Sequence, residues 1–97
     1  MGTITIEIKR KHFLNSEGYM SISKCPLALA TQEFFKDKNI TVGGDCLNNQ
    51  YDRKINSYTF DDSFWKRTFI ESKIEEAQKC LKSKKKFNNV FLELTKQ

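Results

Sequence analysis

The sequence has few of the residues that build membrane spans or disulfide frameworks. No apolar run approaches the roughly 18 residues that a membrane-spanning helix needs. Apolar and polar residues alternate from Thr3 to Lys11, where a secretory signal would be continuously apolar. The three cysteines, Cys25, Cys46 and Cys80, are an odd and widely spaced set, which is typical of reduced thiols rather than of a secreted scaffold. We therefore expect a cytoplasmic protein without a membrane segment.

The spacings that mark metal, nucleotide and nucleophile sites are also missing. There is no Cys-x-x-Cys pair of the kind that binds zinc, and Gly43-Gly44 does not fit the Gly-x-Gly-x-x-Gly pattern of a phosphate-binding turn. Cys25 precedes an expected helix, where backbone N–H groups lower a thiol pKa, and His12 is the only histidine that could serve it as a base. No family signature surrounds Cys25, so a cysteine-dependent enzyme is kept only as an outside alternative. We expect no enzyme, no metal site and no cofactor.

The residues that are present predict an α+β domain. The chain has 97 residues, 30% of them charged, and eight phenylalanines, which indicates one packed domain over 1–97. Alternation with β-branched residues over Thr3–Lys9 predicts a strand, and 11–24 is expected to be a loop. Proline in the first helical turn predicts a helix that starts at Cys25-Pro26 and ends between Lys36 and Asn39.

The second half of the chain completes the order. Ile40–Val42 and Ile55–Phe60 are expected to be two strands of one hairpin, with a bulge at Gly43-Gly44. A second helix is expected over 61–81, and Val90–Thr95 alternates again as a last strand. The order β-α-β-β-α-β is that of the ferredoxin-like, split βαβ arrangement. We expect a four-stranded antiparallel sheet with two helices on one face.

The caps and the core follow from the same patterns. Asp61, Asp62 and Ser63 are candidate N-caps, because short polar and acidic side chains satisfy the first N–H groups of a helix. Residues on the apolar side of each element are expected to be buried together. They are Ile4, Ile6, Ile8, Leu27, Phe34, Trp65, Phe69, Ile74, Leu92 and Leu94.

Positive charge is the clearest functional feature of the sequence. The net charge of +5 favours acidic partners such as nucleic acid, a nucleotide or an acidic protein face. Two clusters supply the expected binding residues: Lys9, Arg10 and Lys11 after the first strand, and Lys79, Lys82, Lys84, Lys85 and Lys86 at the end of the second helix. Lysines at a helix end are also stable as a merely solvated surface. An alternative binding surface is the loop with Asn48, Asn49, Tyr51 and Arg53.

Several short motifs resemble those of a group of short bacteriophage and prophage proteins. They are Cys25–Ala30 (Cys-Pro-Leu-Ala-Leu-Ala), Val42–Gly44 (Val-Gly-Gly), Tyr58–Asp61 (Tyr-Thr-Phe-Asp) and the apolar last strand. The resemblance implies a setting, the cytoplasm of a phage-infected bacterium, rather than a mechanism. We therefore expect a non-enzymatic binding protein that modulates a host factor, most concretely an inhibitor of an antiphage defence that blocks a nuclease or sequesters a nucleotide signal. The alternative is a nucleic-acid-binding accessory protein.

Overall fold

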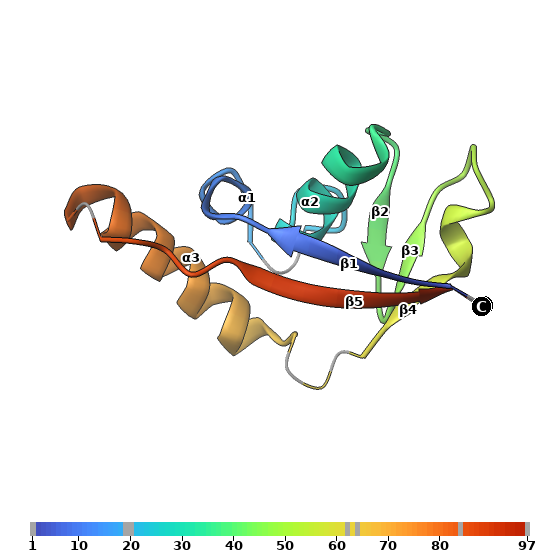
Figure 1. The fold of residues 1–97 in the computed structure, drawn as a ribbon. Helices are drawn as coiled ribbons and strands as arrows, with labels where there is room; N and C mark the ends of the chain where they lie inside the picture. Colours follow the sequence, from blue (N-terminus) through green and yellow to red (C-terminus); the bar gives the residue numbers. More distant parts are fainter. Residues whose placement is uncertain (1, 19–20, 62, 64, 84, 97) are drawn as a thin grey trace.

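A five-stranded antiparallel sheet forms the body of the structure (Figure 1). The structure is a computed structural model that describes residues 2–18, 21–61, 63, 65–83 and 85–96. The strands lie in the spatial order β1 (Thr3–Ile8), β5 (Val90–Lys96), β4 (Tyr58–Phe60), β3 (Cys46–Asn48) and β2 (Thr41–Gly43). The predicted α+β class is confirmed, whereas the predicted four-stranded sheet is wrong by one strand.

The sheet curves around one helix. The helices within the described residues are α1 (Arg10–Leu14), α2 (Pro26–Phe35) and α3 (Arg67–Ser83), with a short 3-10 turn, η1 (Ile55–Ser57). Helix α2 contacts both β1 and β2, the two edge strands, so the sheet wraps around it. Helix α3 instead packs mainly against α1, beyond the end of the sheet (Figure 1). The expected pair of helices on one face of the sheet is therefore replaced by one helix inside the curve and two that pack on each other.

The first half of the predicted order is confirmed with one addition. β1 has the predicted alternation, with Ile6 and Ile8 buried. α2 begins at Pro26, as predicted, because proline lacks only an N–H that a helix start does not use. The expected loop over 11–24 contains part of α1, whose Phe13 is buried in the core. Five residues of helix carry too little periodicity to be distinguished from a loop in the sequence.

The expected hairpin has different strands. β2 pairs with β3, and Gly43 pairs with Cys46, so Gly44 and Asp45 form a two-residue turn rather than a bulge. Gly44 has φ +62° at the first central position, where hairpin turns of this length favour glycine. Ile55–Ser57 forms η1, and only the end of the predicted third strand is extended, as β4.

Helix α3 starts later than the predicted N-cap residues indicated. It begins at Arg67, so Asp61 and Ser63 lie before the helix, and Asp62 lies outside the described residues. The carboxylate of Asp61 accepts the N–H of Ser63 at 2.9 Å and stabilises a turn. The same hydrogen-bonding chemistry that caps helices serves turns, which is why the sequence pattern was ambiguous.

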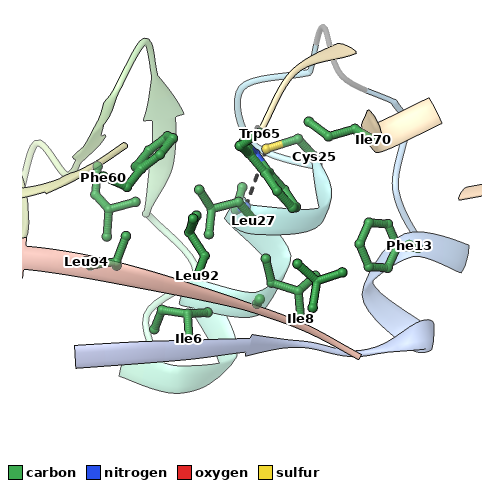
Figure 2. Close-up of a cluster of buried hydrophobic side chains, with 14 of the residues drawn as sticks. Ile6, Ile8, Phe13, Cys25, Leu27, Phe60, Trp65, Ile70, Leu92 and Leu94 are labelled. Carbon is green, nitrogen blue, oxygen red and sulfur yellow. Dashed lines mark hydrogen bonds between the residues drawn. The ribbon is translucent and has the colours of Figure 1, made fainter. Parts of the chain in front are cut away.

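Most of the predicted core is buried. Ile6, Ile8, Leu27, Trp65, Leu92 and Leu94 are 5% exposed or less, as Figure 2 shows for the side chains that meet between β1, β5 and α2. Ile4, Phe69 and Ile74 are partly buried against this cluster. The prediction that Phe34 is buried is wrong, because its side chain is 51% exposed. Phe34 shares the helical face of Leu27 and Ala30, but it lies in the last turn of α2, where Phe35 packs against the core in its place.

Replacing Lys36 with glycine is expected to stabilise the fold. Lys36 ends α2 with φ +54° and ψ +44°, a left-handed conformation that costs a residue with a Cβ roughly 1–2 kcal/mol. Glycine avoids this cost, but part of the gain in stability is offset because glycine has more conformational freedom in the unfolded chain. We expect Lys36→Gly to raise the free energy of unfolding by about 0.5–1 kcal/mol, measured by urea denaturation. Lys36→Ala, which keeps the Cβ, is the control and should give no gain.

Candidate functional site

The structure brings the two predicted basic clusters together. Lys9, Arg10 and Lys11, at the start of α1, line a hollow of about 430 Å³ whose other wall is Lys86. Lys86 also lines a second hollow of about 530 Å³ at the end of α3. The two hollows therefore adjoin, although their residues come from opposite ends of the sequence. We call the following set the basic surface: Lys9, Arg10, Lys11, Lys79, Lys82, Lys85 and Lys86.

Contacts with α3 and with β1 hold the segment 85–89 that joins the two clusters. The ammonium group of Lys73 lies 4.8 Å from the ring centre of Phe87 and donates to the carbonyl of Asn88 at 3.4 Å. The thiol of Cys80 donates a long hydrogen bond to the carbonyl of Lys86 at 4.0 Å. The side-chain amide of Asn89 donates to Glu7 on β1 at 3.3 Å. The junction is thus tied to both α3 and the sheet.

Several cations of the basic surface have no carboxylate partner among the described residues. Lys9, Lys11 and Lys79 pair with Glu7, Glu33 and Glu75 at 3.8, 2.9 and 3.0 Å. Within 2–18, 21–61, 63, 65–83 and 85–96, no ion pair involves Arg10, Lys82, Lys85 or Lys86. Lys84, which the sequence also assigned to this cluster, lies outside the described residues. Unpaired cations raise the local positive potential, which attracts an anionic partner.

Apolar side chains lie between the cations. Leu14 and Phe87 line the hollow beside α1, and Leu81 on α3 is 60% exposed beside Lys82. Leu81 follows the buried Ala77 at helical spacing, yet its own side chain faces solvent. Of these apolar side chains, only Leu81 is well exposed, whereas Phe87 is 8% exposed, so the surface is mainly charged.

The alternative loop surface is mainly structural at its centre. Asn49 is 2% exposed and its side chain donates to Asp37 at 2.6 Å. Its amide oxygen accepts the N–H groups of Tyr51 and Asp52 at 2.8 and 3.1 Å, which folds the loop into a turn. Asn48 and Arg53 are exposed, and so is Tyr51, at 72%. Asn49 is therefore not available to a partner, whereas the other three residues are.

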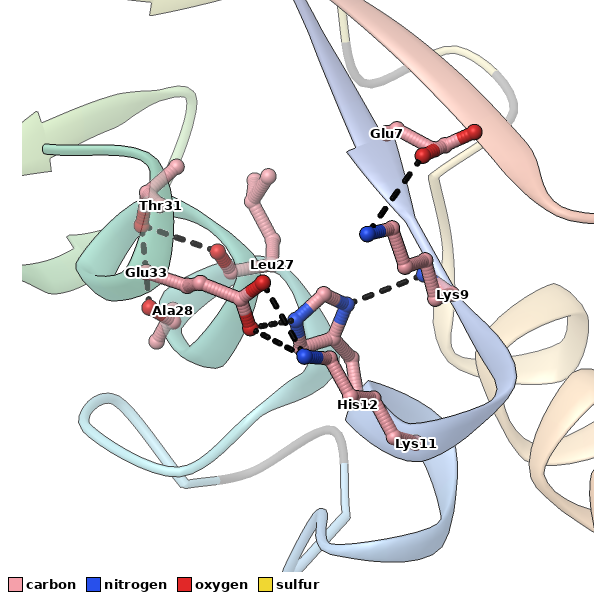
Figure 3. Close-up of polar contacts among 8 residues, drawn as sticks. All are labelled: Glu7, Lys9, Lys11, His12, Leu27, Ala28, Thr31 and Glu33. Carbon is pink, nitrogen blue, oxygen red and sulfur yellow. Dashed lines mark hydrogen bonds and ion pairs between the residues drawn. The ribbon is translucent and has the colours of Figure 1, made fainter.

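His12 is a buried structural residue beside the basic surface (Figure 3). Its Nδ1 accepts the backbone N–H of Lys9 at 2.9 Å, so the proton of the neutral ring is on Nε2, which donates to Glu33 at 3.0 Å. Burial lowers the pKa of His12, and this outweighs the opposing effect of the Glu33 carboxylate. Lys11 and then His12 hold the pKa of Glu33 at about 2. Both ring nitrogens are occupied, so His12 positions α1 against α2.

Acid is expected to destabilise the protein in two steps. The pKa of His12 is lower when folded than its ordinary 6.5, so its contribution to stability is present above pH 6.5 and is lost as pH falls below it. The pKa of Glu33 falls from 4.5 to about 2 on folding, so its contribution is lost between those values. Urea denaturation at a series of pH values measures both steps. His12→Gln should remove the first step, and a wild-type stability that is flat from pH 7 to 5 would contradict it.

Cys25 caps helix α2. Its Sγ accepts the backbone N–H of Ala28 at 3.4 Å, and the side chain is 5% exposed (Figure 2). Burial raises the pKa of the thiol, so Cys25 is protonated at neutral pH and is a poor nucleophile. The helix dipole effect that the sequence suggested is therefore outweighed by desolvation. All three cysteines are unpaired thiols.

The comparisons with known proteins return no relative. No protein-family model, curated protein or solved structure matches the chain. The resemblance to phage proteins therefore stays a prediction. Across the described part of the chain, no helix is both long and apolar enough to cross a membrane.

Proposed function

We propose that the chain is a non-enzymatic binding protein that modulates a host factor by docking its basic surface on an acidic face of that factor. One observation carries the proposal: two basic clusters from opposite ends of the sequence adjoin at Lys86. Four cations that have no carboxylate partner in the described residues add to it. Complementary charge of this kind accelerates encounter and disfavours wrong partners.

The most concrete version is an inhibitor of a bacterial antiphage defence. The phage-like motifs of the sequence motivate this setting, and the charge motivates the kind of contact. A nuclease is one target, because carboxylates that hold catalytic metal ions make an acidic site that lysine and arginine side chains can occupy. A nucleotide signal is the other, because the lysine and arginine side chains that line the hollows can bind phosphate groups.

A nucleic-acid-binding accessory protein is the second candidate. Lysines neutralise phosphates, but proteins that bind single strands also stack bases on exposed aromatic rings. Among the described residues, the exposed aromatics include Tyr51 and Phe91, and neither lines the hollows of the basic surface. Phe87, which does line one hollow, is only 8% exposed. In the part of the chain that the structure describes, these lysines have no aromatic platform beside them, which favours a protein partner.

Affinity capture from a bacterial lysate separates these candidates. The bait is the wild-type chain, and the lysate is used with and without nuclease treatment. A protein that is retained after nuclease treatment and eluted by salt supports the proposal. Capture of nucleic acid alone, with a steep salt dependence, supports the accessory protein. Expression of the chain in a bacterium with an active defence should then raise phage plating if the captured protein belongs to that defence.

A further inference from the structure

The two edges of the sheet differ, because the edge at β2 is covered by a neighbouring segment and the edge at β1 is free. At the other edge, the backbone N–H of Val42 on β2 donates to the carbonyl of Ile22 at 2.8 Å, so a neighbouring segment covers it. β1 pairs only with β5 in the sheet order. Among the described residues, β1 contains no proline or bulge, although the charges of Glu7 and Lys9 stand at its end, where charge is one device that limits edge pairing.

The register shows which backbone groups of β1 are unpaired. Lys96 donates to the carbonyl of Gly2 at 2.7 Å, so the pair formed by these residues is hydrogen-bonded. Hydrogen-bonded pairs alternate along an antiparallel ladder. Ile4, Ile6 and Ile8 therefore bond to β5, and the N–H and C=O groups of Thr3, Thr5 and Glu7 point away from the sheet.

A groove runs beside this edge. It has a volume of about 250 Å³, and β1 forms one wall while α2 forms the other. Thr5, Ile6 and Glu7 are on the strand side, and Ala30, Glu33 and Phe34 are on the helix side. Lys9 and His12 also line the groove. Phe34 is 51% exposed, which leaves an aromatic ring at the wall of the groove without full cover.

The charged side chains at the groove form ion pairs with other side chains of the same chain. The Glu33 carboxylate contacts Lys11 at 2.9 Å and His12 at 3.0 Å, and Glu7 lies 3.8 Å from Lys9 (Figure 3). A charged peptide would therefore find no unpaired opposite charge there, unlike at the basic surface. The complementary occupant is an uncharged backbone with an apolar side chain directed at Phe34.

We propose that the groove between β1 and α2 binds an extended, uncharged apolar peptide segment of a partner protein by adding it to the sheet as a further strand. Thr3, Thr5 and Glu7 hydrogen-bond its backbone, and Phe34 contacts an apolar side chain. Addition of a strand at a sheet edge is a general mode of peptide recognition, in which the backbone bonds give affinity and alternate side chains give specificity. This site meets the basic surface at Lys9, which lines both the groove and the hollow beside α1, and it does not depend on the proposed function.

The test selects binders from a displayed library of random decapeptides on the wild-type chain. Each binder is then measured on Thr5→Pro, which removes an outward N–H and no bond to β5, because proline is tolerated at such an edge position. Thr5→Val keeps the N–H and is the matched control. We expect Thr5→Pro to weaken binding on the order of tenfold or more, Phe34→Ser to weaken it, and Thr5→Val to leave it unchanged.

Three further readouts complete the experiment. Thermal melts by circular dichroism must show that each variant is folded. Hydrogen exchange should slow at the amides of Thr3, Thr5 and Glu7 when a selected synthetic peptide binds. Binding should be unchanged in a variant with Lys82, Lys85 and Lys86 replaced by Glu, which separates this site from the basic surface. Failure to enrich any peptide, or binders that tolerate Thr5→Pro, would overturn the proposal. So would a wild-type dimer that Thr5→Pro converts to a monomer, because the occupant would then be a second copy.

Discussion

Replacing Phe13 with alanine is expected to lower the free energy of unfolding by about 3–5 kcal/mol. The ring is completely buried, and its centre lies 6.3 Å from Trp65 and 5.6 Å from Phe87. Phe13 therefore joins α1 to the residues on either side of α3, and alanine would leave a cavity that these rings cannot fill. A loss of this size is a large part of the roughly 5–15 kcal/mol that stabilises a typical domain. Urea denaturation of the two proteins measures it.

Phe34→Ala is the matched control for this prediction. It makes the same chemical change at a ring that is 51% exposed. Little apolar area returns to water there, so the expected loss is below about 1 kcal/mol. Equal losses in the two variants would mean that Phe13 is not the centre of the contact between α1 and α3.

Reversing charge on the basic surface is expected to abolish most binding of an anionic partner. The variant replaces Lys82, Lys85 and Lys86 with Glu, and all three are exposed. Electrostatic steering changes association rates by roughly 10-fold to 1000-fold, so the loss should appear first in the association rate and should shrink as salt is added. Surface plasmon resonance with the captured partner, at two or more salt concentrations, measures both effects.

A variant with Lys38, Lys54 and Lys66 replaced by Glu is the matched control. These lysines are also exposed, lie outside the basic surface and give the same change in net charge. The control should bind nearly as the wild type does. Glutamates at the end of α3 oppose the helix dipole, which costs up to about 1 kcal/mol each, so melts of both variants are needed. Equal loss in both variants would show a dependence on net charge rather than on this surface.

The fold could be predicted where the sequence has long or chemically distinct patterns. β1, β5 and the start of α2 follow from alternation and from proline at a helix start. Short elements could not be recognised, because three-residue strands and five-residue helices contain less than two repeats of any pattern. The pairing of β2 with β3 depends on the turn at Gly44, which the sequence also allowed as a bulge.

The candidate site could be predicted in part. The residue types at the two clusters were evident from the sequence, but their convergence depends on the packing of α1 against α3 and on the contacts of Phe87. The roles of Asn49 and His12 as structural residues also depend on distant partners, Asp37 and Glu33. The groove beside β1 was not predicted at all. Which strand lies at an edge follows from the sheet order, and no local pattern contains that order.

Titration of the ¹⁵N-labelled chain with an octaglutamate peptide tests the central claim most directly. The claim is that the two clusters form one surface for an anionic partner, so the amide signals of Lys9–Lys11 and of Lys82, Lys85 and Lys86 should shift together with the same half-saturation concentration. The signals of the loop at Asn48–Arg53 should stay in place. Shifts confined to one cluster, or different half-saturation concentrations for the two, would contradict the claim, and so would shifts centred on the loop.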